Sequence, residues 1–352
     1  MSTAQFKPLA GCTASPVGRH THHLVILCLL AWLCLHGIAF TDFREFKLLL
    51  TSWSQLTLPP EKQYLYSSPW LAGLGRVVSP LLSPSLSYAA LCATGLLLLV
   101  ATLHKYLLSE HGPNEAWVAW LLLMATPLPM VWLQWIGKSD TYLLSAWLLM
   151  RLVNRPAIHA ALAMVMVLCH RELALLILMM DALLSRHIRL GTLLGTLMGL
   201  GLMALYHHVV LEAAPMGRIA YATQDRWSIP LGNLSVWPAM LTCSMSWFWI
   251  SVIAFCRPGW RDAIVLLACL AVAAMTLDFT RVFGLLSMPW ILDLLQRGVP
   301  AAAQAAHTSR LWRVGIILMA IMPSAQLINF EVKGPRILDN ITMMLGALHK
   351  TP

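Results

Sequence analysis

The sequence predicts an all-α, polytopic transmembrane helical bundle of about eleven helices, with interfacial helices in the first outer loop. Hydrophobic residues make up 59% of the chain and charged residues only 11%, whereas soluble domains carry about 25% charged residues. Apolar runs recur along nearly the whole length and are separated by short charged turns. The ten-residue alternation of apolar and polar side chains that is typical of a transmembrane β-barrel is absent.

No linker or shift in composition divides the chain, so we expect residues 1–352 to form a single membrane domain. Residues 1–23 are expected to be a cytoplasmic N-terminal segment. The apolar run from Leu24 to Phe40 has no small-residue cleavage site after it, which predicts a retained signal anchor. Residues 41–84 then form an outer loop, and residues 330–352 form a C-terminal tail.

The remaining apolar runs predict the other helices. These runs cover residues 85–103, 117–136, 141–153, 157–169, 172–184, 190–211, 237–255, 262–277, 282–295 and 312–329. Threading them alternately through a membrane places Arg151, Arg155, Arg186 and Arg189 in short turns on the cytoplasmic side, as the positive-inside rule requires. We therefore expect a multi-pass protein of the bacterial inner membrane with a cytoplasmic N-terminus.

Three consecutive runs, 141–153, 157–169 and 172–184, are short for membrane spans. At about 13 residues each they give helices of roughly 20 Å, against a hydrocarbon core of about 30 Å. Pro127 and Pro129 stand just before the first of these runs and predict a break in the helix. The short runs are either broken or tilted helices that line a cavity, or a sign that the segmentation differs here.

In the outer loop, apolar residues recur at helical spacing from Trp70 to Leu82, and Phe43, Phe46 and Leu50 suggest a second such face. This spacing is typical of amphipathic helices that lie in the membrane interface. Ordinary packing helices would show the same spacing, so both interpretations stay open.

Several classes of protein are disfavoured by composition and motifs. The formal net charge is +9, but the basic residues are dispersed, which argues against nucleic-acid binding and favours topology signals and contact with membrane lipids.

The eight cysteines include no CxxC pair and lie mostly in apolar runs, so we expect small core residues rather than disulfides or a zinc site. The His-rich segment 19–23 could bind a metal but is more typical of a cytoplasmic flank. No Walker loop, GxSxG or HExxH motif occurs, so no cofactor is predicted and no motif supports a divalent metal.

Four polar groups fall on the outer side of the membrane in this topology. They are Asp42-Phe43-Arg44-Glu45, Gly137-Lys138-Ser139-Asp140, His170-Arg171-Glu172 and Asp278-Phe279-Thr280-Arg281. A charge at membrane depth costs from about 2.5 to more than 10 kcal/mol, so such residues pair with one another or face a hydrated cavity. Either the pairs Arg171–Glu172 and Asp278–Arg281 merely neutralise each other at helix ends, or the four groups build one functional cavity.

A cavity of this composition suits glycosyl transfer from a lipid phosphate. The carboxylates of Asp42 and Glu45 could take a proton from a sugar hydroxyl. The leaving phosphate needs stabilisation of its charge, which a cationic cluster opposite a carboxylate supplies. The candidate cations are Lys138, His170, Arg171 and Arg281. The tryptophans mainly predict interfacial belts, with stacking of a sugar on Trp70, Trp132 or Trp135 as the alternative.

Several features form a recognisable layout along the chain. They are Asp42 after the first helix, the three later polar groups and, in the outer loop, the stretch Tyr64-Leu65-Tyr66-Ser67-Ser68-Pro69-Trp70-Leu71. This layout, over residues 24–295, resembles the GT-C superfamily of polyprenyl-phosphate-sugar-dependent membrane glycosyltransferases and is similar to uncharacterised bacterial members. The resemblance implies a GT-C-like fold with Asp42 as catalytic base. Many members carry adjacent or once-spaced acids in the first loop, whereas Phe43 and Arg44 separate Asp42 from Glu45 here.

The residues and the resemblance together predict an inner-membrane glycosyltransferase. It would move a sugar from a polyprenyl-phosphate donor to a lipid-linked or cell-envelope acceptor on the periplasmic side, with Glu45 assisting Asp42. The cations would bind the donor phosphate, and Asp140, Glu172 and Asp278 would orient the cations or the acceptor.

Two alternatives stay open. One is a transporter or flippase of a lipid-linked or polar substrate, although paired internal repeats are not evident; the other is a non-catalytic membrane protein of polysaccharide assembly, or a polymerase or ligase.

Overall fold

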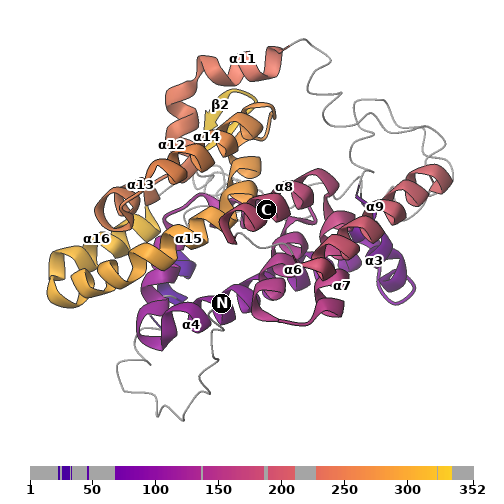
Figure 1. Ribbon diagram of the computed structural model, residues 1–352, viewed down its shortest axis with the longest axis horizontal. Helices are drawn as coiled ribbons and strands as arrows, with labels where there is room; N and C mark the ends of the chain where they lie inside the picture. The colour runs from indigo at the N-terminus through magenta and orange to yellow at the C-terminus, as the bar shows by residue number, and fades with distance from the viewer. Residues whose placement is uncertain are drawn as a thin grey trace, which may run out of the picture.

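The computed structural model is a nearly all-α protein (Figure 1). It describes residues 23, 26–31, 33, 46, 68–135, 138–185, 189–210, 227–322 and 324–334. The helices before the gap at 211–226 are α3 (Trp70–Val78), α4 (Pro84–Met124), α5 (Leu128–Gln134), α6 (Asp140–Leu152), α7 (Pro156–Cys169), α8 (Arg171–Ser185) and α9 (Leu190–Val210). Those after it are α11 (Ser228–Ser235), α12 (Trp237–Met245), α13 (Phe248–Ser251), the π-helical turn η2 (Val252–Cys256), α14 (Trp260–Ala274), α15 (Phe279–Thr308) and α16 (Arg310–Ile321). Each apolar run predicted between residues 85 and 295 falls on one or more of these helices.

Two of the described helices, Pro84–Met124 and Leu190–Val209, are long and apolar enough to cross a membrane. The pair Trp237–Met245 and Phe248–Cys256, bent by 73°, makes a third if it is one broken span. α9 exposes large apolar side chains along its length, from Leu190 at 70% to Val209 at 68%. Such exposed apolar surface is unfavourable in water and is compatible with a protein that associates with a membrane.

α4 is two helical arms that meet at Gly112. This glycine has φ 69° and ψ 172°, a conformation that other residues adopt only with strain, and Pro113 follows it. The indole nitrogen of Trp120 donates a hydrogen bond to Nδ1 of His104 at 3.1 Å, which ties the two arms together. The arms correspond to the separate runs predicted at 85–103 and 117–136. The break expected at Pro127 is also present, because α4 ends at Met124 and α5 begins at Leu128.

α6, α7 and α8 are short helices of 13, 14 and 15 residues, as the sequence predicts. α7 packs closely against α9 along a row of glycines at every fourth position: Gly191, Gly195 and Gly199. A Cβ added at Gly195 would collide with the carbonyl oxygen of Ala160 in α7. The row is the small-residue pattern through which helices approach each other in membranes, and we did not single it out in the sequence.

α15 forms the centre of the described structure. It contacts α4, α5, α8, α12, α14, α16, η2 and the first strand, and Figure 1 shows it running between the α4–α9 helices and the α11–α14 helices. Every residue from Phe279 through Leu292 is buried. The helix therefore carries Arg281 into the interior of the protein.

The strictly all-α prediction is wrong at the C-terminal end of the described chain. Where we expected helix up to residue 329 and a tail from residue 330, α16 ends at Ile321 and two strands form an antiparallel hairpin, β1 (Gln326–Ile328) and β2 (Glu331–Lys333). Asn329 and Phe330 both have positive φ, as in a type I′ hairpin turn. A short apolar run has no clear period, so its sequence does not separate a strand from the end of a helix.

α3 is the described part of the two interface helices expected in the outer loop. Leu71 is buried, and the ring of Trp70 meets that of Tyr142 edge-on at 6.1 Å, whereas Val77 and Leu81 are exposed. The apolar residues expected on one face are therefore divided between the protein core and the surface. Of the second expected helix only Phe46 is described, and it packs against Tyr88 with ring centroids 5.1 Å apart.

Candidate functional site

A buried ion pair between two of the predicted site residues joins α6 to α15. Asp140 is the first residue of α6, and Arg281 lies in the first turn of α15. Nε of Arg281 donates to Oδ2 of Asp140 at 2.6 Å, and Nη2 donates to Oδ1 at 2.8 Å. Both side chains are only 4% exposed. This two-point geometry is the one in which a buried ion pair best offsets the cost of removing its charges from water.

Three further predicted residues surround this pair. Asp278 stands one helical turn before Arg281, with Oδ2 at 3.6 Å from Nη1 of Arg281. Burial alone would raise the pKa of Asp140, but the Arg281 guanidinium, with smaller contributions from His170 and Lys138, holds this pKa below its ordinary value of 3.8. We call these five residues, Lys138, Asp140, His170, Asp278 and Arg281, the Asp140 cluster.

The ring of Trp135 is near two cations of the cluster. Nζ of Lys138 is 5.6 Å from the centre of its ring, and Cζ of Arg281 is 5.5 Å from it. The indole nitrogen donates to Oε1 of Gln326 at 3.2 Å, and the amide of Gln326 also donates to Gln134. The β-hairpin therefore holds this indole in place. Trp135, which we considered for sugar stacking, has its ring engaged by these cations.

His170 connects the cluster to Arg171 and Glu172 at the junction of α7 and α8. Its Nδ1 accepts a hydrogen bond from the backbone nitrogen of Leu173 at 3.3 Å and lies 3.5 Å from Oε2 of Glu172. Nη2 of Arg171 donates to Oε1 of Glu172 at 2.8 Å. The hydroxyl of Ser139 donates to the carbonyl oxygen of Cys169 at 2.6 Å, which brings the start of α6 next to the end of α7.

The structure thus brings seven of the nine predicted site residues to one end of the helices, from three separate stretches of sequence. Lys138 and Asp140 come from the entry to α6, His170 to Glu172 from the entry to α8, and Asp278 and Arg281 from the entry to α15. Asp42 and Glu45 lie outside the described residues. The nearest described residue, Phe46, packs on Tyr88 in the first turns of α4. One turn further along that helix, the carbonyl oxygen of Leu91 accepts a hydrogen bond from Tyr142.

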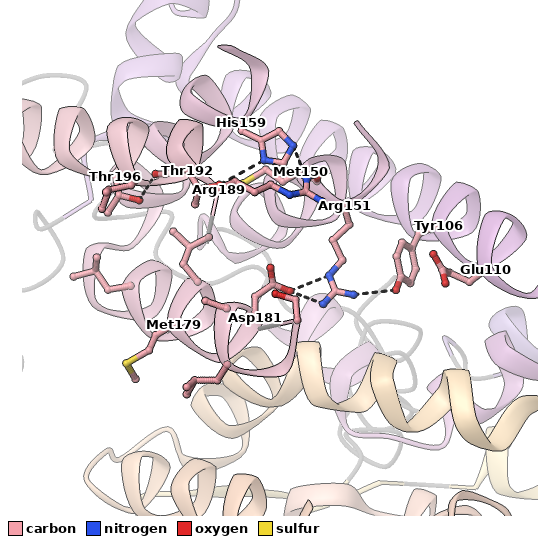
Figure 2. Close-up of a pocket in the computed structure, with 16 residues that line it drawn as sticks. Tyr106, Glu110, Met150, Arg151, His159, Met179, Asp181, Arg189, Thr192 and Thr196 are labelled. Atoms are coloured by element: carbon pink, nitrogen blue, oxygen red, sulfur yellow. Dashed lines mark hydrogen bonds and ion pairs between the residues drawn. The ribbon is translucent and has the colours of Figure 1, made fainter. Parts of the chain in front are cut away.

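A second polar cluster lies at the opposite ends of the same short helices (Figure 2). Arg151 donates to Oδ1 of Asp181 from Nε at 2.9 Å and from Nη2 at 2.5 Å, and to the hydroxyl of Tyr106 at 3.3 Å. The amide of Gln296 donates to the same hydroxyl at 3.1 Å and to Oε2 of Glu110 at 2.7 Å. Tyr106, Glu110, Arg151 and Asp181 border a cavity of about 630 Å³.

Sequence reasoning missed this cluster because it treated the arginines only as topology signals. One signal was available. Asp181 lies within the predicted apolar run 172–184, and an acid inside such a run usually has a nearby basic partner. Which basic residue pairs with it depends on how α6 packs beside α8, which the sequence does not show.

A third cluster has the features of a structural clamp. Asp262 in the first turn of α14 accepts hydrogen bonds from Arg297 at 2.6 and 3.0 Å, from the indole of Trp290 at 2.8 Å and from the backbone of Gly259 at 2.7 Å. The two carboxylate oxygens of Asp262 thus accept four hydrogen bonds from the protein. The clamp fixes α14 against the middle of α15.

Within the described ranges, no three His, Cys, Asp or Glu side chains are placed to hold a metal ion. The described cysteines, Cys28, Cys92, Cys169, Cys243, Cys256 and Cys269, are buried and free, as expected for core residues. Most of the His-rich segment 19–23 lies outside the described residues.

Comparison of the chain with protein-family models, with curated proteins and with solved structures gave no match. The assignment of a function therefore depends on the fold and the polar clusters alone.

Proposed function

We propose that this protein is a membrane-embedded glycosyltransferase of the GT-C type. It transfers a sugar from a polyprenyl-phosphate donor to a lipid-linked or cell-envelope acceptor. The observation that carries this proposal is the convergence of Lys138, Asp140, His170 and Arg281 at one end of the helices. A purely structural bundle gains little from such a cluster, because apolar replacement of a buried ion pair is often neutral or stabilising.

In the proposed reaction, Asp42 accepts the proton of the acceptor hydroxyl, with Glu45 assisting. The hydroxyl oxygen bonds to the anomeric carbon of the donor while the bond from that carbon to the phosphate oxygen breaks. The electron pair leaves with the polyprenyl phosphate, whose charge Lys138, His170 and Arg171 stabilise.

The contacts of Arg281 support a more specific role for the acids. Arg281 is engaged by Asp140 and Asp278, and Arg171 by Glu172. In the proposal Asp140, Asp278 and Glu172 orient these guanidinium groups. The positive charge of the guanidinium groups then stabilises the negative charge of the leaving phosphate.

We place the reaction on the periplasmic face of the bacterial inner membrane, in a multi-pass chain with a cytoplasmic N-terminus. Support comes from the two ends of α6. Asp140 begins this helix and Arg151 stands near its end, about 16 Å away at 1.5 Å per residue. The predicted periplasmic residues and the predicted cytoplasmic arginines thus lie at opposite ends of one helix.

A transfer assay with the full chain tests the proposal. The protein is reconstituted in liposomes of bacterial phospholipids, supplied with polyprenyl phosphates that carry radiolabelled sugars and with an envelope extract as acceptor. We expect label to move into the acceptor fraction. Asp42→Asn and His170→Ala should each abolish transfer while the protein elutes as a folded species. Arg310→Gln, which changes an exposed arginine at the start of α16, should retain full transfer.

Transfer no higher than in empty liposomes, for every donor tested, would contradict the proposal. Full activity of Asp42→Asn would remove Asp42 as the base.

A flippase is the second candidate, because polar groups occur at both ends of α6, α7 and α8 and the cavity lies at the end opposite the Asp140 cluster. The same liposomes distinguish the two. A flippase moves the donor from the outer to the inner leaflet with the bond between sugar and phosphate intact, whereas a transferase releases polyprenyl phosphate.

A further inference from the structure

The cavity beside Arg151 has a polar wall and an apolar wall. Its polar wall combines Tyr106 and Glu110 of α4, Arg151 of α6, His159 of α7, Asp181 of α8, and Arg189 just before α9 (Figure 2). The apolar wall consists mainly of leucine and methionine side chains of α8, together with Met150 of α6 and Leu193 of α9. A space of about 630 Å³ is in the range of pockets that hold small organic ligands.

The two arginines of the polar wall differ in their partners. Arg151 is neutralised by Asp181. Arg189 is exposed, and Nη1 contacts the carbonyl oxygen of Met150 at 3.1 Å and Nε2 of His159 at 2.7 Å. Within the described part of the chain, no carboxylate lies within 4.0 Å of Arg189. Among the described residues its guanidinium is therefore a cation at the cavity that no carboxylate pairs with.

His159 does not fully satisfy Arg189. The same Nε2 lies 2.7 Å from the carbonyl oxygen of Val153. One imidazole nitrogen cannot donate to this carbonyl and accept from Arg189 at the same time. An anion bound to Arg189 would free Nε2 to donate to Val153, so it would improve the contacts of both residues.

The depth of the cavity points to a lipid rather than a soluble anion. The candidate span in α9 begins at Leu190, which puts Arg189 at the level of the membrane surface, where lipid phosphates lie. Thr196, which also lines the cavity, is about 9 Å further into the span than Leu190. Met179 and Leu183 on the α8 side are 53% and 66% exposed, which leaves apolar surface for an acyl chain.

We propose that this cavity binds a membrane phospholipid, with the phosphate on Arg189 and the beginning of an acyl chain against Met179 and Leu183. The hydroxyl of Thr192 also lines the cavity, whereas that of Thr196 already donates to the backbone carbonyl oxygen of Thr192 at 2.8 Å. The site lies at the end of the helices opposite the Asp140 cluster and does not depend on glycosyl transfer.

Native mass spectrometry of the full chain in detergent tests the proposal with defined probes. These are dioleoylphosphatidylglycerol, dioleoylglycerol as the same chains without phosphate, and inorganic phosphate. We expect retention of the phospholipid, much weaker retention of dioleoylglycerol, and no displacement by millimolar phosphate. Arg189→Gln should weaken phospholipid binding about tenfold, the effect of losing one charged hydrogen bond. Arg155→Gln, which removes an exposed arginine at the same end that does not line the cavity, should bind as the wild type does.

A second measurement does not depend on the folding of a variant. A phospholipid with a photoreactive acyl chain should label peptides of α8 and α9 in the wild-type protein. Labelling elsewhere, equal effects of the two arginine substitutions, or equal retention of dioleoylglycerol would each overturn the proposal. Displacement of the phospholipid by inorganic phosphate would identify a soluble-anion site instead and would also overturn it.

Discussion

The guanidinium of Arg281 and the carboxylate of Asp140 share two hydrogen bonds, at 2.6 and 2.8 Å, in a contact from which water is almost excluded. The pair joins the start of α6 to the start of α15, so it fixes the relative position of the helices that carry the Asp140 cluster. Stability and function are both expected to depend on it.

Asp140→Asn removes the closer of the two carboxylates that pair with the buried Arg281 and leaves Asp278, with Oδ2 at 3.6 Å from Nη1 of Arg281, as the weaker counter-charge. The expected loss is about 3–5 kcal/mol in the free energy of unfolding. Replacing both residues with apolar side chains, as in Asp140→Leu with Arg281→Met, should recover a large part of this loss. Thermal unfolding in detergent measures all three proteins.

The matched control is Asp293→Asn. Asp293 pairs with Arg297 at 2.9 Å, but its side chain is 42% exposed. We expect this change to cost at most about 1 kcal/mol, because exposed ion pairs contribute little. Similar losses of unfolding free energy for Asp140→Asn and Asp293→Asn would show that burial does not make the Asp140–Arg281 pair more important for stability.

The lowered pKa of Asp140 predicts how its contribution changes with pH. A carboxyl group with a pKa below its ordinary value of 3.8 stabilises the folded state fully above that value. The contribution is lost as the pH falls through the lower, folded-state pKa. The difference in unfolding temperature between the wild type and Asp140→Asn should therefore be constant from about pH 7 to about pH 5 and shrink below about pH 4. A difference that grows on acidification would contradict the assigned pKa direction.

The glycine row of α9 predicts a position-specific effect on stability. Gly195→Ala places a methyl group where the backbone carbonyl of Ala160 lies, so α7 and α9 must move apart. We expect a destabilisation of about 1–3 kcal/mol, the usual cost of overpacking. Thermal unfolding followed by circular dichroism provides the measurement.

Gly201→Ala is the control in the same helix. A Cβ at Gly201 meets no atom within 4 Å. Alanine favours a helix over glycine by about 1 kcal/mol, so this variant should be as stable as the wild type or more stable. If both alanine substitutions behave alike, close packing at Gly195 is not important for stability.

The proposed topology predicts different accessibility for two introduced cysteines. Ser85→Cys lies in the first turn of α4, near the predicted periplasmic side, and Asn154→Cys lies in the turn between α6 and α7, on the predicted cytoplasmic side. Both positions are exposed. In spheroplasts, a membrane-impermeant maleimide should label Ser85→Cys directly and Asn154→Cys only after the membrane is permeabilised.

The six described native cysteines are buried, and Cys12 and Cys34 lie outside the described residues, so labelling of the wild-type protein is measured first and subtracted. The reverse order of labelling would invert the topology. Direct labelling of both positions would place the two ends of α6 on the same side of the membrane.

The sequence alone determined where most helices lie, including the short helices α6 to α8 and the break before α5. This information is local, because a helix satisfies its own backbone groups and its apolar runs and prolines mark its extent. The hairpin β1–β2 escaped prediction since an apolar run of a few residues has no distinct period.

The choice of partners was decided only by the tertiary structure. From the sequence, Asp278 was the expected partner of Arg281, but the guanidinium makes its closest contacts with Asp140 on another helix. Arg151 and Arg189 had the appearance of topology signals until α6, α7, α8 and α9 placed them around one cavity. Such pairings arise between side chains far apart in the sequence and depend on how closely the helices pack, for which the glycine row of α9 is responsible in part.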